Sequence, residues 1–167
     1  MSQSGQPEGA KNHTTVARTS DREIAVTRAF DGPARVVFEA WTRPELFRLW
    51  WAPKSMGATL SACEIDPRTG GGYRITFGDG GSDSMTFFGR YLEVTPPSRL
   101  VWTNEESDDA PVTTVTFEDR GGSTLLVLNE LYPSAGPVAD AAAGMQAMMS
   151  EQFAQLDELL ASLRRQA

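Results

Sequence analysis

Two adjoining segments, Phe30-Asp-Gly-Pro-Ala-Arg-Val-Val-Phe-Glu-Ala-Trp41 and Arg43-Pro-Glu-Leu-Phe-Arg-Leu-Trp-Trp-Ala-Pro53, decide the expected fold of this chain. Pro33 and Pro44 stand where a helix accepts a residue without an N–H, and Asp31 can supply a capping oxygen. The stretch therefore predicts the end of a strand and two short helices. These helices carry more apolar surface than they can bury on each other, so they must lie across something larger, or across a ligand.

Six further strands are predicted downstream of these helices. Their segments are rich in β-branched and aromatic residues, several with alternation of period two, and turns rich in Gly, Pro and Asp separate them. The six predicted strands cover residues 59–65, 72–77, 85–94, 99–104, 113–118 and 123–131. Residues 22–30, before the helices, are predicted to form a seventh strand. An antiparallel sheet of six or seven strands is expected.

After Pro137 the apolar period becomes helical. Apolar residues recur at spacings of three and four on one face of a helix of about 25 residues. They are Met145, Met149, Phe153, Leu156, Leu160 and Leu163. A helix of this length, rising about 1.5 Å per residue, can cross the whole sheet. The predicted fold class is therefore α+β, with the sheet wrapped around a long C-terminal helix.

This order of elements resembles the helix-grip fold of the SRPBCC superfamily, which includes START-like lipid-binding domains and the birch pollen allergen. The local residues are similar to the branch named after homologues of the activator of the heat-shock-protein-90 ATPase. The matching pieces are Arg28-Ala-Phe-Asp-Gly-Pro33, Val37-Phe-Glu-Ala-Trp41, Pro44-Glu-Leu-Phe47 with Trp50-Trp51, Asp66-Pro-Arg-Thr-Gly-Gly-Gly-Tyr73, residues 89–102 and Ser123-Thr-Leu-Leu-Val-Leu128. Jointly these pieces are specific for the family, although none is specific for a reaction.

One position departs from the family pattern. Family members usually carry a Gly-Trp pair near the start of the C-terminal helix, where this chain has Met148-Met149. A flexible thioether fills an irregular space, whereas a rigid indole demands a fitted one. If the pair lines a cavity, its contents are expected to differ from those of a typical relative.

Length and composition predict one soluble domain. Of the 167 residues, 1–20 are expected to form a disordered arm, because this polar segment offers almost no apolar surface. Residues 21–167 are expected to form a single helix-grip domain. No apolar run approaches the roughly 18 residues of a membrane span, and no signal sequence opens the chain. A cytoplasmic location is therefore expected.

Charge and residue types exclude several function classes. The net charge of −7 argues against nucleic acid as a partner, because nucleic acid favours a basic stripe. The only histidine, His13, lies in the arm, so no histidine-dependent triad and no Cys/His zinc site can form in the domain. The single cysteine, Cys63, is expected to be a small buried residue rather than a reactive thiol. No metal or cofactor is expected.

Two residues are weak candidates for catalysis. The family resemblance places Leu126 and Leu128 inward, and Glu130 follows them at the same parity. At a cavity mouth, burial would raise the pKa of Glu130 and suit it to proton transfer, although a solvated strand end is the alternative. Tyr91 is the expected inward residue of its strand, and its hydroxyl could anchor a polar end of a ligand.

These observations predict a binding protein for a small hydrophobic molecule, held between the sheet and the C-terminal helix. The expected cavity residues are Val37, Trp41, Trp50, Trp51, Tyr73, Ile75, Phe77, Tyr91, Trp102, Leu126, Leu128, Met145, Met149 and Phe153. Packing of the same side chains into a solid core is the alternative.

Two other functions stay open, and a homodimer is possible. An enzyme similar to the cyclases or hydrolases of the superfamily would use Glu130 or Tyr91 as its acid or base. A chaperone-associated interaction domain, as the family name suggests, would need an exposed docking surface. Leu125 and Val127 are expected on the outer face of the sheet, where an apolar patch could hold two copies together as a homodimer.

Overall fold

The computed structural model describes residues 13–57, 59–78, 84–136 and 138–166. The strands are β1 Thr15–Ser20, β2 Glu23–Asp31, β3 Leu60–Ile65, β4 Gly72–Phe77, β5 Met85–Thr95, β6 Arg99–Thr103, β7 Val112–Asp119 and β8 Ser123–Leu131. The helices are α2 Ala34–Thr42, α3 Pro44–Phe47, the 3-10 turn η1 Lys54–Met56 and the long α4 Val138–Gln166. The predicted segments and the observed elements coincide closely.

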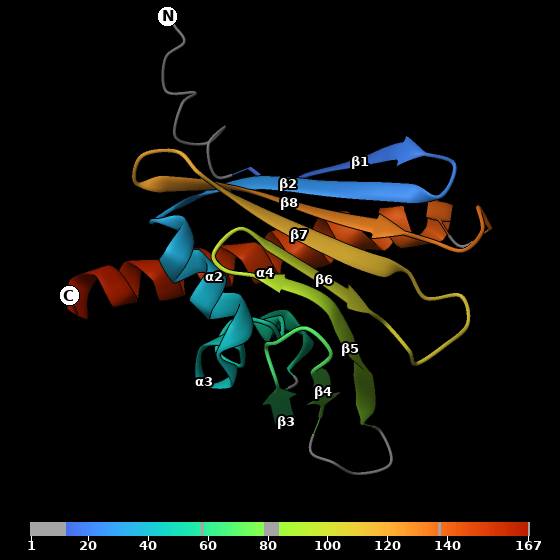
Figure 1. Ribbon diagram of the computed structural model, residues 1–167, viewed down its shortest axis with the longest axis horizontal. Helices are drawn as coiled ribbons and strands as arrows, with labels where there is room; N and C mark the ends of the chain where they lie inside the picture. Colours follow the sequence, from blue (N-terminus) through green and yellow to red (C-terminus); the bar gives the residue numbers. More distant parts are fainter. Residues whose placement is uncertain (1–12, 58, 79–83, 137, 167) are drawn as a thin grey trace, which may run out of the picture.

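All the strands belong to one antiparallel sheet in the order β1-β2-β8-β7-β6-β5-β4-β3. β2 pairs with β8 along its whole length, from Glu23 opposite Leu131 to Asp31 opposite Ser123. The sheet curves around α4, and α2 and α3 lie at one end of it (Figure 1). The helix-grip prediction is confirmed, with eight strands among the described residues in place of the expected six or seven.

The additional strand is β1, and it corrects the predicted disordered arm over residues 15–20. β1 pairs with β2 at the edge of the sheet. Just before it, the buried Thr14 accepts a hydrogen bond of 2.7 Å from Arg28, and its carbonyl accepts one of 2.9 Å from Gln146 of α4. Composition missed this strand because β1 is held by backbone pairing and leaves most of its side chains exposed. Residues 1–12 of the predicted arm lie outside the described residues.

Helix α2 begins where the sequence placed it, directly after Pro33, but its first turn is capped from elsewhere. Asp119, at the end of β7, accepts a hydrogen bond of 3.2 Å from the backbone N–H of Ala34 through Oδ2. This backbone N–H lowers the pKa of Asp119, because it stabilises the carboxylate. The sequence pointed to Asp31 for this role, since a cap supplied by another strand leaves no local pattern.

The apolar stripe of α4 forms the centre of the core, as its spacing predicts. Phe153 and Leu156 are fully buried, and the ring of Phe153 meets that of Phe30 edge to face at 5.4 Å between centroids. The same helix is tied to the segment after α3 by Gln155. Its amide nitrogen donates to the carbonyls of Trp50 and Ala52 at 3.0 and 2.9 Å.

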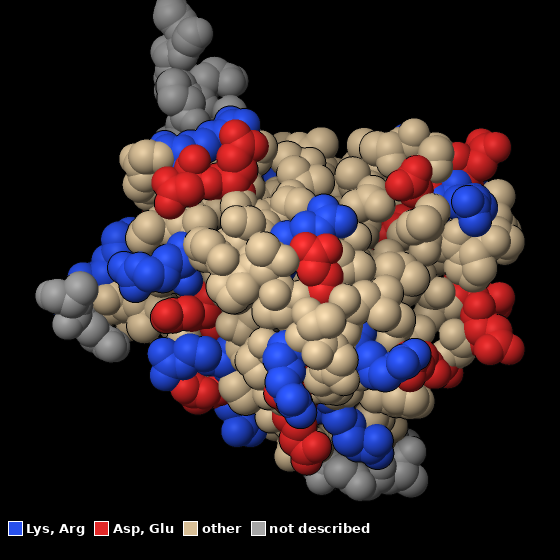
Figure 2. All heavy atoms as spheres, viewed as in Figure 1, with Lys and Arg blue, Asp and Glu red and all other residues tan. Residues whose placement is uncertain are grey.

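Charged side chains of both signs are interspersed on the face drawn in Figure 2. Exposed charged side chains also form ion pairs, such as Arg90 with Glu105 at 2.8 Å and Arg99 with Glu93 at 3.1 Å. Each such exposed pair contributes little to stability. None of the helices in the described part of the chain is both long and apolar enough to cross a membrane.

Candidate ligand-binding cavity

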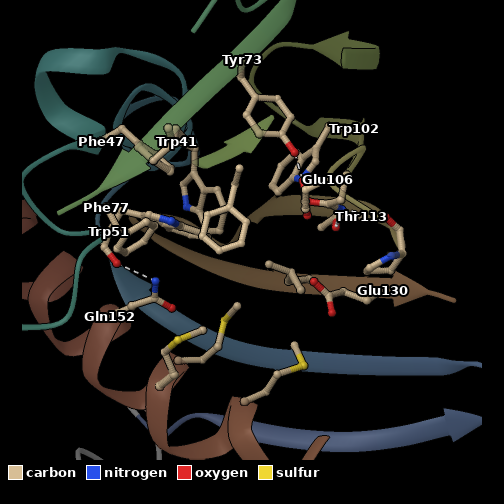
Figure 3. Close-up of a pocket in the computed structure, with 18 of the residues that line it drawn as sticks. Trp41, Phe47, Trp51, Tyr73, Phe77, Trp102, Glu106, Thr113, Glu130 and Gln152 are labelled. Atoms are coloured by element: carbon tan, nitrogen blue, oxygen red, sulfur yellow. Dashed lines mark hydrogen bonds between the residues drawn. The ribbon is translucent and has the colours of Figure 1, made fainter. Parts of the chain in front are cut away.

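A cavity of about 370 Å³ lies between the sheet and α4. Aromatic side chains from α2, the segment after α3 and strands β4 to β6 form one wall, and methionines of α4 form the other (Figure 3). The lining residues are Trp41, Phe47, Trp51, Ile65, Tyr73, Ile75, Phe77, Met85, Phe87, Tyr91, Trp102, Asn104, Glu106, Pro111, Thr113, Leu128, Glu130, Tyr132, Met145, Met148, Met149 and Gln152. The volume lies within the usual range of small-molecule sites.

The structure brings most of the residues named from the sequence to this cavity. They are Trp41, Trp51, Tyr73, Ile75, Phe77, Tyr91, Trp102, Leu128, Met145 and Met149, together with Glu130. The other four, Val37, Trp50, Leu126 and Phe153, do not line it and are fully buried in the core. Strand parity and helical spacing show which side chains point inward, but not which of them border empty space.

Several lining residues were not named from the sequence. For some a signal existed: Phe47 lies four residues before Trp51, and Phe87 shares the strand parity of Tyr91. Thr113 shares the strand parity of the buried Val115, Tyr132 follows Glu130 at the same parity, and Gln152 follows Met149 at helical spacing. Asn104 and Glu106 carried no local signal, because only the long-range arrangement of loops and strands brings them to the cavity.

The aromatic wall is centred on Trp41. Its ring lies 4.9 Å from that of Trp50, 5.9 Å from that of Trp51 and 6.0 Å from that of Trp102, measured between centroids. Such edge-to-face and tilted contacts stabilise an aromatic cluster beyond simple area burial. The wall is therefore a rigid surface that can pack against the flat face of a ligand.

Gly89 of β5 makes room for Tyr73 on this wall. A Cβ at this position would stand 2.0 Å from the carbonyl oxygen of Thr103 and 2.9 Å from the ring of Tyr73, so no side chain fits there. The hydroxyl of Tyr73 donates to that same carbonyl oxygen at 2.8 Å. The lack of a side chain at Gly89 therefore lets the ring of Tyr73, on the neighbouring strand, take its place at the cavity.

Polar side chains gather where β7 and β8 border the cavity, and Glu130, Tyr132, Thr113, Asn104 and Tyr73 form this outer polar group. The hydroxyl of Tyr132 donates to Glu130 at 2.7 Å, and the amide of Asn104 donates to the hydroxyl of Thr113 at 2.9 Å. Tyr73 lies 3.1 Å from the amide oxygen of Asn104. An apolar cavity with a few convergent polar groups is typical of a specific ligand site.

Burial controls the charge state of this group. It raises the pKa of Glu130, and the hydrogen bond from Tyr132 offsets only part of that effect. It also raises the pKa of Tyr73 and of Tyr91, so both phenols stay protonated at neutral pH. A carboxyl with a raised pKa can keep its proton and donate a hydrogen bond at a pH where an ordinary surface carboxylate can only accept one.

The raised pKa of Glu130 predicts how a Glu130→Gln variant responds to pH. The ordinary pKa of a glutamate side chain is 4.5. As pH rises above this value, Glu130 loses its proton in the unfolded state at a lower pH than in the folded state. The stability of the original protein is therefore reduced as pH rises through that window, whereas the amide does not titrate. Relative to the original protein, Glu130→Gln should gain stability in urea denaturation as pH rises above 4.5.

Glu105→Gln is the matched control for that measurement. Hydrogen bonds from Thr103 and Arg90 lower the pKa of Glu105, so this carboxylate stabilises the fold above its lowered pKa. Relative to the original protein, Glu105→Gln should therefore lose stability as pH rises. This loss should develop below pH 4.5, the ordinary pKa of a glutamate side chain. The same trend with pH in both variants would contradict the assignment of a raised pKa to Glu130.

The described residues contain no group of three His, Cys, Asp or Glu side chains arranged to hold a metal ion. Cys63 is half-buried, with its sulfur 3.8 Å from the carbonyl oxygen of Pro44. Burial raises the pKa of this thiol, which disfavours the reactive thiolate. The chemistry available at the cavity therefore comes from the outer polar group and the aromatic wall.

A family model described as Activator of Hsp90 ATPase homolog 1-like protein matches residues 31–161. The match includes both short helices, most of the sheet and nearly all of α4. The chain belongs to this family. The Hsp90 ATPase activator homologues are part of the SRPBCC superfamily. The resemblance found in the sequence is therefore confirmed for the family and for the superfamily.

Solved structures show that this member of the Hsp90 ATPase activator homologues shares its fold with proteins from other organisms. A protein from Rhodobacter sphaeroides has 24% identity and a TM-score of 0.81, with 90% of this chain and 99% of the other covered. A protein from Nitrosomonas europaea has 22% identity and a TM-score of 0.77, with 89% and 99% covered. A family member from Aeromonas hydrophila has 20% identity and a TM-score of 0.69, with 81% and 92% covered.

These identities are low enough that the likeness shows the fold alone. Among curated proteins, none matches the sequence of this chain at a significant level. The function must therefore be argued from the cavity itself.

Proposed function

We propose that this protein binds a small, mainly apolar molecule in the cavity between the sheet and α4. The observation that carries the proposal is the cavity of about 370 Å³ with an aromatic wall on one side and thioethers on the other. Protein interiors are close-packed, and voids larger than a water molecule are few. A space of this size and chemistry is therefore better explained by a ligand than by imperfect packing.

The edge of the cavity supports the same function. Met85 and Met148 line it and are 57% and 43% exposed, so apolar side chains lie where the cavity meets the surface. Flexible thioethers adapt to a passing or bound ligand without a fixed geometry. Met148 and Met149 replace the Gly-Trp pair usual in the family, which supports a ligand that differs from those of typical relatives.

Glu130 favours a second candidate function, proton transfer to or from the bound molecule. Its carboxyl borders the cavity, and burial raises its pKa toward the range in which a general acid works near neutral pH. In that case Glu130→Gln would abolish turnover of a substrate while leaving its affinity nearly unchanged. A binding protein alone would show the opposite pattern, with changed affinity and no turnover in either form.

Titration with the neutral fluorescent probe N-phenyl-1-naphthylamine tests the binding function. Its two aromatic groups match the aromatic and thioether walls, so we expect saturable binding with a Kd on the order of 1 μM. Probe emission should rise and shift to the blue, and tryptophan emission should be quenched, because Trp41, Trp51 and Trp102 line the cavity. Near-ultraviolet circular dichroism in the same samples must show native packing. Absence of saturable binding by the native protein would overturn the proposed function.

A further inference from the structure

Two carboxyl groups line the cavity, and they lie at the end that holds the outer polar group. One is Glu130 of β8, and the other is Glu106 in the loop between β6 and β7. Figure 3 shows both on the side of Thr113, away from Gln152. None of the described residues that line the cavity is a lysine, an arginine or a histidine. The charge on the cavity lining is therefore of one sign, and it is concentrated at one end.

The two carboxyl groups are near enough to act on the same surroundings. Burial is the main cause of the raised pKa of Glu130, and the negative charge of Glu106 adds to it. Both carboxylates also add to the effect of burial on the pKa of Tyr73, which lines the cavity beside them. The outer polar group and Glu106 therefore share one region of negative potential at the cavity.

The protein groups that contact Glu130 are uncharged. The hydroxyl of Tyr132 donates to its Oε1 at 2.7 Å, and Thr113 forms a second hydrogen bond to the carboxyl. A carboxylate can accept about four hydrogen bonds, so acceptor sites are left over. A carboxylate removed from water is normally paired with a cation. A ligand with a positive charge would supply the partner that the cavity lining does not.

Two arginines near this end are engaged outside the cavity. Arg90 pairs with Glu105 at 2.8 Å, and Arg22 donates to the backbone carbonyl of Tyr132 at 3.4 Å. Neither guanidinium lines the cavity, and both arginines are exposed. They leave the negative potential inside the cavity in place.

Aromatic rings at the same end also suit a cation. The rings of Tyr73 and Trp102 both line the cavity, with 6.4 Å between their centroids. The face of an aromatic ring attracts an ammonium group, and the attraction adds to that of a carboxylate. Glu106 is exposed and Glu130 is only partly buried, so a cation beside them would keep part of its hydration. This lowers the desolvation cost that opposes buried ion pairs.

We infer that the cavity selects lipophilic amines, with the ammonium group beside Glu130 and Glu106 and the apolar body between the aromatic wall and the methionines of α4. This inference rests on the proposed function, because it specifies the ligand class of the same cavity. A primary ammonium group can donate three hydrogen bonds to the carboxylates. An alcohol brings no charge, and a ligand carboxylate would meet two groups of its own sign.

Displacement of the neutral probe N-phenyl-1-naphthylamine by four compounds with one naphthalene body tests the inference. They are 2-(aminomethyl)naphthalene, 2-(hydroxymethyl)naphthalene, 2-naphthoate and 2-methylnaphthalene, compared at pH 7.5. The amine should bind about tenfold more tightly than the alcohol, and the carboxylate at least about tenfold more weakly than the alcohol. An undifferentiated apolar cavity would instead favour 2-methylnaphthalene and bind the amine poorly.

Two substitutions of nearly constant size remove the charges, and a third is the matched control. In Glu130→Gln the preference for the amine over the alcohol should fall at least about fivefold, and in Glu106→Gln about threefold, because the exposed charge is more screened. Affinity for 2-methylnaphthalene should change less than about twofold in both. Glu105→Gln removes the same charge next to Glu106, from a residue that does not line the cavity. The amine preference should stay within about twofold there.

The outcomes separate this inference from the function on which it rests. If neither 2-methylnaphthalene nor N-phenyl-1-naphthylamine binds, the proposed function fails as well. If both bind but the amine is not preferred over the alcohol, the inference fails alone. If Glu105→Gln reduces the preference as much as Glu130→Gln does, the overall negative charge of the protein attracts the amine, and the assigned site is overturned.

Discussion

Replacing Phe153 with alanine is expected to lower the free energy of unfolding by about 3–5 kcal/mol. Phe153 is fully buried at the middle of α4, and its ring meets those of Phe30, Trp41 and Trp50 at centroid distances of 5.4, 6.2 and 6.3 Å. It does not line the cavity, so truncation leaves a new void inside close-packed aromatic rings. Urea denaturation at neutral pH measures the loss.

Met149→Ala is the matched control, because Met149 lies one turn earlier on the same face of α4. Met149 is also buried, at 4% exposure, but it borders the cavity and has fewer packed neighbours to lose on that side. We expect its truncation to cost less than about 2 kcal/mol, below the usual range for a packed methionine. A larger loss for Met149→Ala than for Phe153→Ala would show that the space beside α4 is filled by packed protein.

A larger side chain at the same position is expected to have the largest effect on binding. Met149→Trp inserts an indole into a cavity of about 370 Å³ from the methionine wall. The affinity for N-phenyl-1-naphthylamine should fall at least about tenfold, because the indole occupies space that the probe needs. Since the indole would enter the cavity and displace no packed side chain, stability should change by less than about 1 kcal/mol.

Leu156→Trp shows what the same kind of enlargement does in the solid part of the core. Leu156 is fully buried on α4 and does not border the cavity. Overpacking at such a site costs about 1–3 kcal/mol or more, and probe affinity should be little changed if the protein still folds. Similar losses of stability in Met149→Trp and Leu156→Trp would argue that both positions are packed.

Much of the fold could be predicted because local signals and tertiary packing agree. Pro33 and Pro44 marked the starts of α2 and α3, and the spacing of apolar residues after Pro137 marked α4. The family resemblance then indicated that these elements combine into a helix-grip fold. β1 was missed because its polar residues gain their place from backbone pairing with β2 and from the contact between Thr14 and Arg28, neither of which leaves an apolar pattern.

The cavity could be predicted in part for the same reason. Tyr73, Ile75 and Tyr91 were placed inward by strand parity, and the structure shows them at the cavity. The family resemblance also placed Leu126 inward, and this residue is buried without bordering the cavity. Gln152 stands three residues after Met149 and four before Leu156, so helical spacing places it on the apolar face, although its polar side chain alone gives no reason to expect a cavity residue. Its orientation depends on a carbonyl about a hundred positions away in the chain.

Methyl NMR spectroscopy tests the central claim, that this cavity is a ligand-binding site, most directly. The chain has three isoleucines, of which Ile65 and Ile75 line the cavity and Ile24 is buried in β2 away from it. On titration with N-phenyl-1-naphthylamine, we expect the methyl signals of Ile65, Ile75 and Met149 to shift with one common Kd, while that of Ile24 stays nearly unchanged. Saturation with the probe that leaves the Ile75 and Met149 signals in place, or that shifts Ile24 as strongly, would contradict the account.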